Sequence, residues 1–160
     1  MKTFLVYIVF AYLALAFQGL LFHGVKPDLA FVLVFFYSIR HEQGKGMVFG
    51  ALTGLLIDIS SGFIIGPNIA AKGAAAFLAR NIRDNLFQWN RFISALTAAA
   101  LSLVDMFIVR ICYETFSGVS FANRPWGLSA AGIAYTIAAA LILYPVFNRR
   151  EEVIGGLKNY

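Results

Sequence analysis

The chain is a series of long apolar stretches separated by short polar connections. A helix needs about 20 apolar residues to cross the hydrocarbon core of a bilayer. Six apolar segments can be drawn, at residues 4–22, 27–39, 46–65, 67–79, 91–113 and 128–147. The pattern predicts an all-α integral membrane protein, a six-helix bundle over residues 1–147 with a short tail at 148–160.

Three of these segments leave alternatives open. The second and fourth segments are short, so half-length or re-entrant helices would also fit them. The first has the basic start, apolar core and small residues of a signal peptide. Because its apolar run continues past Ala16 to Phe22, we expect it to stay in place as a span.

Composition supports a membrane protein. The 160 residues are 60% hydrophobic and only 13% charged, against about 25% charged in typical soluble domains. The net charge of +5 does not indicate nucleic-acid binding, because the basic residues lie at the ends of apolar runs and form no stripe along one face.

The basic residues also predict the topology, since cytoplasmic connections are enriched in Lys and Arg. With six spans and a cytoplasmic N-terminus, the inner side carries Lys2, Arg40, Lys45, Arg80, Arg83, Arg91, Arg149, Arg150 and Lys158. The outer side carries Lys26 and Arg124. This asymmetry predicts that both termini are cytoplasmic.

The third segment and the connection after it have a glycine at every fourth position, except for Asp58 between Gly54 and Gly62. Its glycines, with those of the following connection, are Gly46, Gly50, Gly54, Gly62 and Gly66. Positions four apart lie on one helix face, and a face without side chains allows close helix packing in lipid. Either another helix of this chain or a helix of a partner protein could pack there.

Some charged residues fall inside the predicted spans, where charge is costly and usually faces protein or a cavity. At 1.5 Å per residue, Asp58, Lys72 and Asp105 lie about 10, 6 and 12 Å below the outer surface. We expect Asp58 to pair with Lys72, with Asp105 as a second acceptor. Such a cluster could fix the helix arrangement, bind a ligand or ion, or relay protons.

No enzymatic site is expected. Covalent catalysis needs a nucleophile and a base within reach of each other, and neither histidine lies inside a predicted span. Cys112 is the only cysteine. We therefore expect no catalytic residue, no metal and no cofactor.

Two motifs together resemble the MreD family, small polytopic rod shape-determining membrane proteins of bacteria. The first is Lys26-Pro27-Asp28-Leu29, opening the second segment. The second is the Gly46–Asp58 glycine series with Gly62 and Gly66. The resemblance covers residues 1–80 well, whereas the second half is similar only in length, span count and basic ending.

The resemblance implies a non-enzymatic scaffold in the cell-elongation machinery of the bacterial cytoplasmic membrane. Its expected partner is a single-span protein like MreC, with MreB and the wall-synthesising polymerase and transpeptidase as indirect partners. It also implies a fold like the substrate-binding components of energy-coupling-factor transporters. The alternative function is therefore a vitamin-binding uptake component, although the first span lacks the Ala-x-x-x-Ala face usual there.

Overall fold

The computed structural model describes residues 2–21, 27–86, 90–117 and 126–156, which form helices and no strand. The helices are α1 (Lys2–Leu21), α2 (Leu29–Ser38), α3 (Gln43–Ser61), α4 (Pro67–Asn85), α5 (Arg91–Ser117) and α6 (Trp126–Gly156). The expected all-helical architecture with six helices is confirmed for this part of the chain.

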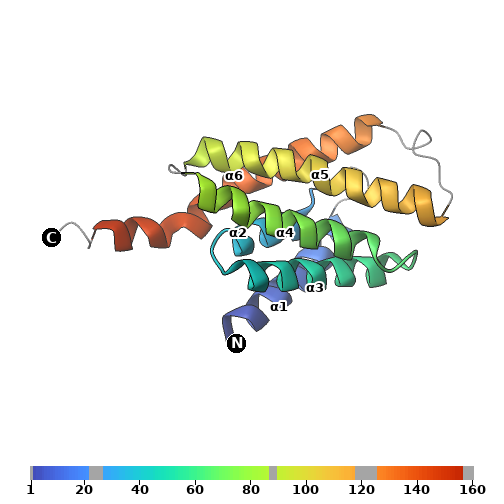
Figure 1. The fold of residues 1–160 in the computed structure, drawn as a ribbon, viewed down its shortest axis with the longest axis horizontal. Coiled ribbons are helices and arrows are strands. Elements are labelled where there is room, and N and C mark those ends of the chain that lie inside the picture. The colour runs from blue at the N-terminus through green and yellow to red at the C-terminus, as the bar shows by residue number, and fades with distance from the viewer. Residues whose placement is uncertain (1, 22–26, 87–89, 118–125, 157–160) are drawn as a thin grey trace.

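The helices run back and forth along the long axis of the molecule (Figure 1). The C-terminal ends of α2 and α4 lie at one end, with the N-terminal ends of α3 and α5. Arg40, Lys45, Arg83 and Arg91 lie at or beside these helix ends. The C-terminal end of α3 and the N-terminal end of α4 lie at the opposite end, so the basic residues gather at one end of the bundle.

The short helix α2 forms the centre of the bundle. It contacts each of the other five helices, and eight of its ten residues are buried. Phe31, Phe35 and Phe36 pack with alanines of α4, α5 and α6 and with Tyr144. Ten residues span only about 15 Å, so α2 is shorter than the hydrocarbon core of a bilayer.

The surface is apolar and the interior contains charge, the reverse of a soluble protein. Phe92 and Ile142 are more than 70% exposed, whereas Asp58 and Lys72 are 1% exposed. By length and composition, Arg91–Phe116 can cross a membrane. The apolar parts of three other helices, Phe4–Leu20, Leu29–Ser38 and Ala130–Pro145, are shorter.

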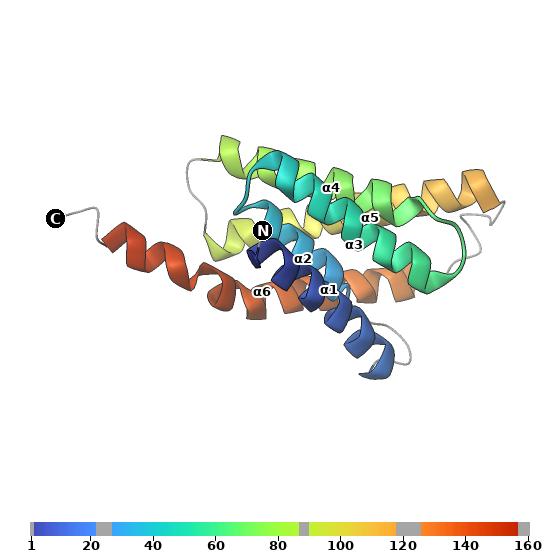
Figure 2. The same cartoon turned by 90° about the horizontal axis from the view of Figure 1, so that it is seen from below.

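Several helices are longer than the segments predicted for them, and α5 continues beyond residue 113 to Ser117. α4 continues beyond residue 79 to Asn85. α6 passes through Pro145 and continues to Gly156, into the predicted tail. Both views show the last part of α6 projecting beyond the other helices (Figures 1 and 2).

Candidate functional site

The buried Lys72 side chain forms two ion pairs in the half of the bundle away from the basic end. Its Nζ lies 2.7 Å from Asp28 Oδ2 and 2.7 Å from Asp105 Oδ2. The Lys72 side chain is 1% exposed, that of Asp105 10% and that of Asp28 36%. Nζ also lies 5.6 Å from the centre of the Phe31 ring. The ammonium therefore connects α4 to α5 and to the start of α2.

The expected pairing of Asp58 with Lys72 is wrong. Asp58 lies in the last turn of α3 and accepts hydrogen bonds from the start of α4. Its donors are the backbone N–H groups of Gly66, Asn68 and Ile69 at 2.8, 3.2 and 3.3 Å, and Asn68 Nδ2 at 2.7 Å. Free N–H groups at a helix N-terminus attract a carboxylate, so Asp58 stabilises the α3–α4 turn.

Asp28 begins α2 as its N-cap. Its Oδ1 accepts a hydrogen bond of 2.8 Å from the backbone N–H of Phe31. Its own N–H donates to Thr136 Oγ1 of α6 at 2.9 Å. The preceding carbonyl, of Pro27, accepts from Gln18 Nε2 of α1. The Pro27-Asp28 element thus connects the ends of several helices at one point.

A polar pocket of about 280 Å³ adjoins this element. It is lined by Leu15 and Gln18 of α1, Asp28, Ile57 of α3 and Asn68 of α4. Gln18 is 6% exposed and Asn68 9%. The Gln18 Oε1 atom is buried and has no hydrogen-bond partner among the described residues.

Two carboxyl groups, those of Asp28 and Asp105, share one ammonium in this cluster, that of Lys72. Asp105 Oδ1 is buried and accepts no hydrogen bond from the described residues. Removing one partner of a buried ion pair typically costs about 3–5 kcal/mol, so these groups constrain the packing of α2, α4 and α5 strongly.

Three glycines of the predicted series pack inside the chain. A Cβ added at Gly54 would lie 2.2 Å from the Asn68 carbonyl oxygen, and one at Gly50 would lie 2.5 Å from that of Lys72. A Cβ at Gly46 would lie 3.1 Å from Ser38 Oγ. The backbones of α3 and α4 therefore touch, so Gly50 and Gly54 are covered by α4 and not by a partner.

Gly62 and Gly66 do not belong to this packing face. Gly62 ends α3 in the left-handed conformation, with φ of 65°, and Gly66 precedes α4 with φ of 136°. A Cβ at either position would meet no described atom within 4 Å. Their role is conformational, because residues other than glycine rarely adopt these angles.

Sequence reasoning missed Gln18, Asn68 and Thr136. Gln18 did leave a signal, since it is the one amide in the apolar run 4–22. Asn68 follows Gly66-Pro67 at the start of a segment, where a polar residue is ordinary. Thr136 gave no signal, because threonine is frequent in membrane helices. Within the described residues, no group of three His, Cys, Asp or Glu side chains could hold a metal ion.

An apolar exterior, a charged interior and a helix long enough to cross a bilayer are the features of a small α-helical membrane protein. A family model described as rod shape-determining protein MreD matches residues 1–149. The chain belongs to the MreD family, whose members determine rod shape in bacteria. No curated protein and no solved structure matches the chain significantly.

Proposed function

We propose that the protein is a non-enzymatic membrane scaffold of the bacterial cell-elongation complex and binds a single-span partner like MreC. The MreD family match over residues 1–149 carries this proposal. The buried ionic groups support it, because Lys72, Asp28 and Asp105 bind one another and Asp58 binds the start of α4. Through the partner, the scaffold would connect to MreB and to the wall-synthesising polymerase and transpeptidase.

In this proposal the bundle lies in the cytoplasmic membrane with both termini inside. The gathering of Arg40, Lys45, Arg83 and Arg91 at one end supports this orientation. The short central α2 is consistent with a bundle in which neighbours cover a helix that is shorter than the bilayer. We also propose that the fold is similar to that of the substrate-binding components of energy-coupling-factor transporters.

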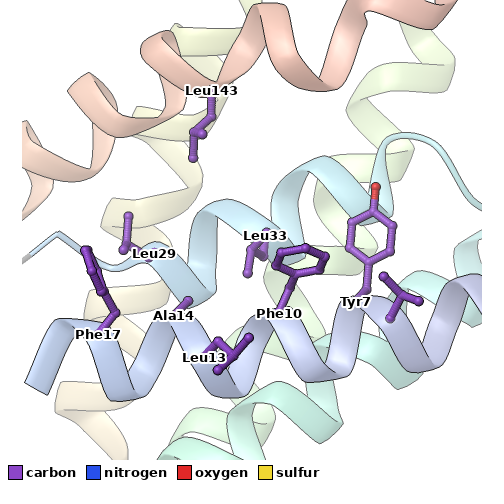
Figure 3. A pocket seen from close by; sticks show the side chains of 9 residues that line it. Tyr7, Phe10, Leu13, Ala14, Phe17, Leu29, Leu33 and Leu143 are labelled. Carbon is purple, nitrogen blue, oxygen red and sulfur yellow. The ribbon is translucent and has the colours of Figure 1, made fainter.

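The surface that we assign to the partner helix is an apolar groove of about 600 Å³. Figure 3 shows its wall along α1, with Tyr7, Phe10, Leu13, Ala14 and Phe17, facing Leu29 and Leu33 of α2 and Leu143 of α6. It follows α1 from Val6 to Phe17, about 17 Å at helical rise. In lipid, shape and packing drive helix association, and a groove between three helices offers more packing than a convex face.

Site-specific photocrosslinking in native membranes tests this assignment. A photoreactive residue at Phe10, which is 57% exposed, is expected to capture a single-span protein of the elongation complex. The matched control is Ile111 on α5, which is 56% exposed and lies outside the groove. Crosslinks from Phe10 to lipid alone would overturn the groove assignment.

Mass spectrometry of proteins that co-purify with the tagged chain tests the function itself. Recovery of the single-span partner with wall-synthesis proteins is the expected outcome. Recovery of an ATPase pair with a transmembrane coupling protein would instead support the vitamin-uptake alternative and overturn the scaffold proposal.

A further inference from the structure

The exposed face of α1 carries large apolar side chains at the spacing of a coiled coil. Successive members are alternately four and three residues apart, as are the a and d positions of a heptad repeat. Each of these side chains is at least 50% exposed. We call this set the α1 seam, and its residues are Val6, Phe10, Leu13, Phe17 and Leu20.

Other faces of α1 differ from the seam. Phe4, Ile8 and Ala11 pack on the bundle, in the apolar cluster that contains Tyr37. A second exposed stripe begins at Leu5 and has the same spacing, but it ends in two small residues, Ala16 and Gly19. Large side chains at heptad spacing along the whole helix are therefore a property of the seam among the exposed stripes of α1.

The seam continues the apolar groove assigned to the partner helix. Its first four residues line the groove, whereas Leu20 lies beyond it. The backbones of α1 and α6 do not come into contact among the described residues. Leu143 of α6 lines the groove across from Phe10 and Leu13 of α1 (Figure 3). A helix lying on the seam would therefore also lie in the space between α1 and α6.

The spacing of the seam determines the handedness of packing. A heptad repeat has a mean period of 3.5 residues, slightly less than the 3.6 residues of one helical turn, so a second helix follows it only by wrapping in a left-handed sense at a crossing angle of about 20°. The right-handed crossing typical of glycine faces, at about 40°, separates the two helices more quickly. The seam is about 21 Å long at helical rise, so a left-handed partner contacts both Val6 and Leu20.

The side chains of the seam also define those expected on the partner helix. Phe10 and Phe17 are seven residues apart and occupy the same heptad position. In a coiled coil each such side chain enters a hole formed by four residues of the facing helix. Helix axes in contact are about 8–10 Å apart, and two phenyl rings fit into that separation where the facing residues are small. A complementary helix therefore has small residues seven positions apart.

We propose that the α1 seam packs along its whole length, in a left-handed coiled-coil arrangement, against a transmembrane helix of the partner that has small residues seven positions apart. This inference rests on the proposed scaffold function, to which it adds the packing geometry and the side-chain chemistry of the partner helix. Leu20 separates the seam from the groove alone, because it belongs to the first and does not line the second.

Photocrosslinking along α1 in native membranes tests the geometry. A photoreactive residue is placed at one seam position at a time in the full-length protein, and each captured polypeptide is identified by mass spectrometry. The same single-span protein is expected to be captured from Val6, Phe10 and Leu20. Leu5 and Tyr12 are the matched controls, because they are similarly exposed on the same helix and lie outside the seam and the groove. From these two positions we expect crosslinks to lipid.

Capture from Phe10 without capture from Val6 and Leu20 would indicate a steep crossing and overturn the seam. Capture from Leu5 and Tyr12 as strong as from the seam would overturn it as well. A crosslinked second copy of this chain would overturn the assignment to a partner. A captured span without two Gly, Ala or Ser residues seven positions apart would overturn the proposed chemistry of the partner.

These outcomes are distinct from failure of the scaffold function. Co-purification of the partner with wall-synthesis proteins would leave that function standing while the seam is rejected. Failure to recover any single-span partner by co-purification would overturn both proposals.

A pair of double variants measures the contribution of the phenyl rings. Phe10→Ala combined with Phe17→Ala is expected to lower recovery of the co-purified partner at least about tenfold, because two side chains that fill holes in the facing helix are lost. Leu5→Ala combined with Tyr12→Ala is the control and should change recovery by less than about twofold. All four side chains are exposed, so the folded yield of both variants should match the wild type. Equal recovery from the two double variants would overturn the role of the rings.

Discussion

Lys72 of α4 and Asp105 of α5 are 33 residues apart in the sequence, yet Nζ and Oδ2 lie 2.7 Å apart. The contact is almost fully covered by the bundle. A buried pair of this kind contributes little net stability when intact, but leaves an uncompensated charge when one partner is removed. It therefore specifies how α4 packs on α5. The loss of stability after removal of one partner can be measured.

Replacing Lys72, whose ammonium is shared by two carboxyl groups, is expected to destabilise the protein strongly. Lys72→Met leaves Asp28 and Asp105 with no counter-ion from this position and should lower the free energy of unfolding by about 3–5 kcal/mol. The measurement is thermal unfolding in detergent, with folded yield as a second readout. Lys45→Met is the control, since that lysine side chain is 61% exposed and exposed pairs contribute about 1 kcal/mol or less.

Asp105→Asn is expected to be much milder than Lys72→Met. The amide oxygen can still accept from Lys72, and Asp28 remains as the charged partner. The cluster would then hold one negative and one positive charge. Equal losses of stability for the two variants would contradict the sharing of one ammonium by two carboxyl groups.

The contact between α3 and α4 allows no side chain at its closest point. Gly54→Ala is expected to lower the free energy of unfolding by about 2 kcal/mol or more, because its Cβ would overlap the Asn68 carbonyl. Gly73→Ala on α4 is the matched control, because its Cβ would meet no described atom within 4 Å. Thermal unfolding of both variants checks the prediction, and equal stabilities would argue against tight packing.

Asp58→Leu is expected to destabilise the α3–α4 turn by about 3 kcal/mol, because the N–H groups of Gly66, Asn68 and Ile69 lose their acceptor. Asp58→Asn keeps one oxygen and should cost about half as much. Limited proteolysis at the turn, with thermal unfolding, measures both effects. A Ser60→Ala control alters an exposed hydroxyl and should change stability by about 0.5 kcal/mol or less.

The proposed topology can be tested by cysteine labelling in a Cys112→Ser background. Gly44 lies exposed in the first turn of α3, and Phe63 lies exposed after its last turn. A membrane-impermeant maleimide applied to intact spheroplasts is expected to label Phe63→Cys and to spare Gly44→Cys until the membrane is opened. The reverse pattern would invert the orientation.

Sequence periodicity predicted the helices better than it predicted the partners of their charges. The rise per residue gives the depth of Asp58, Lys72 and Asp105, but says little about the direction in which each side chain points. Asp58 accepts hydrogen bonds from the start of α4, the next helix in the sequence. Lys72 instead pairs with Asp28 and Asp105, which are distant from it in the sequence. The partner of Lys72 therefore depends on tertiary packing.

The glycine series shows a similar limit. The four-residue spacing continues through Gly62 and Gly66, but the helix ends at Ser61 because Gly62 adopts a left-handed conformation. Equal spacing beyond that point no longer means a shared face. Glycine allows close helix packing at Gly54, whereas at Gly62 it allows the chain to reverse direction.

The central position of α2 has a consequence for biogenesis. α2 enters the translocon before α3 to α6, yet a helix of ten residues is poorly retained in lipid by itself. One side of its core is provided by Ala140 and Tyr144 of α6, which follows the other five described helices in the sequence. The surroundings of α2 are therefore completed only when α6 has been synthesised, and a truncation before α6 would leave the centre of the bundle open rather than its edge.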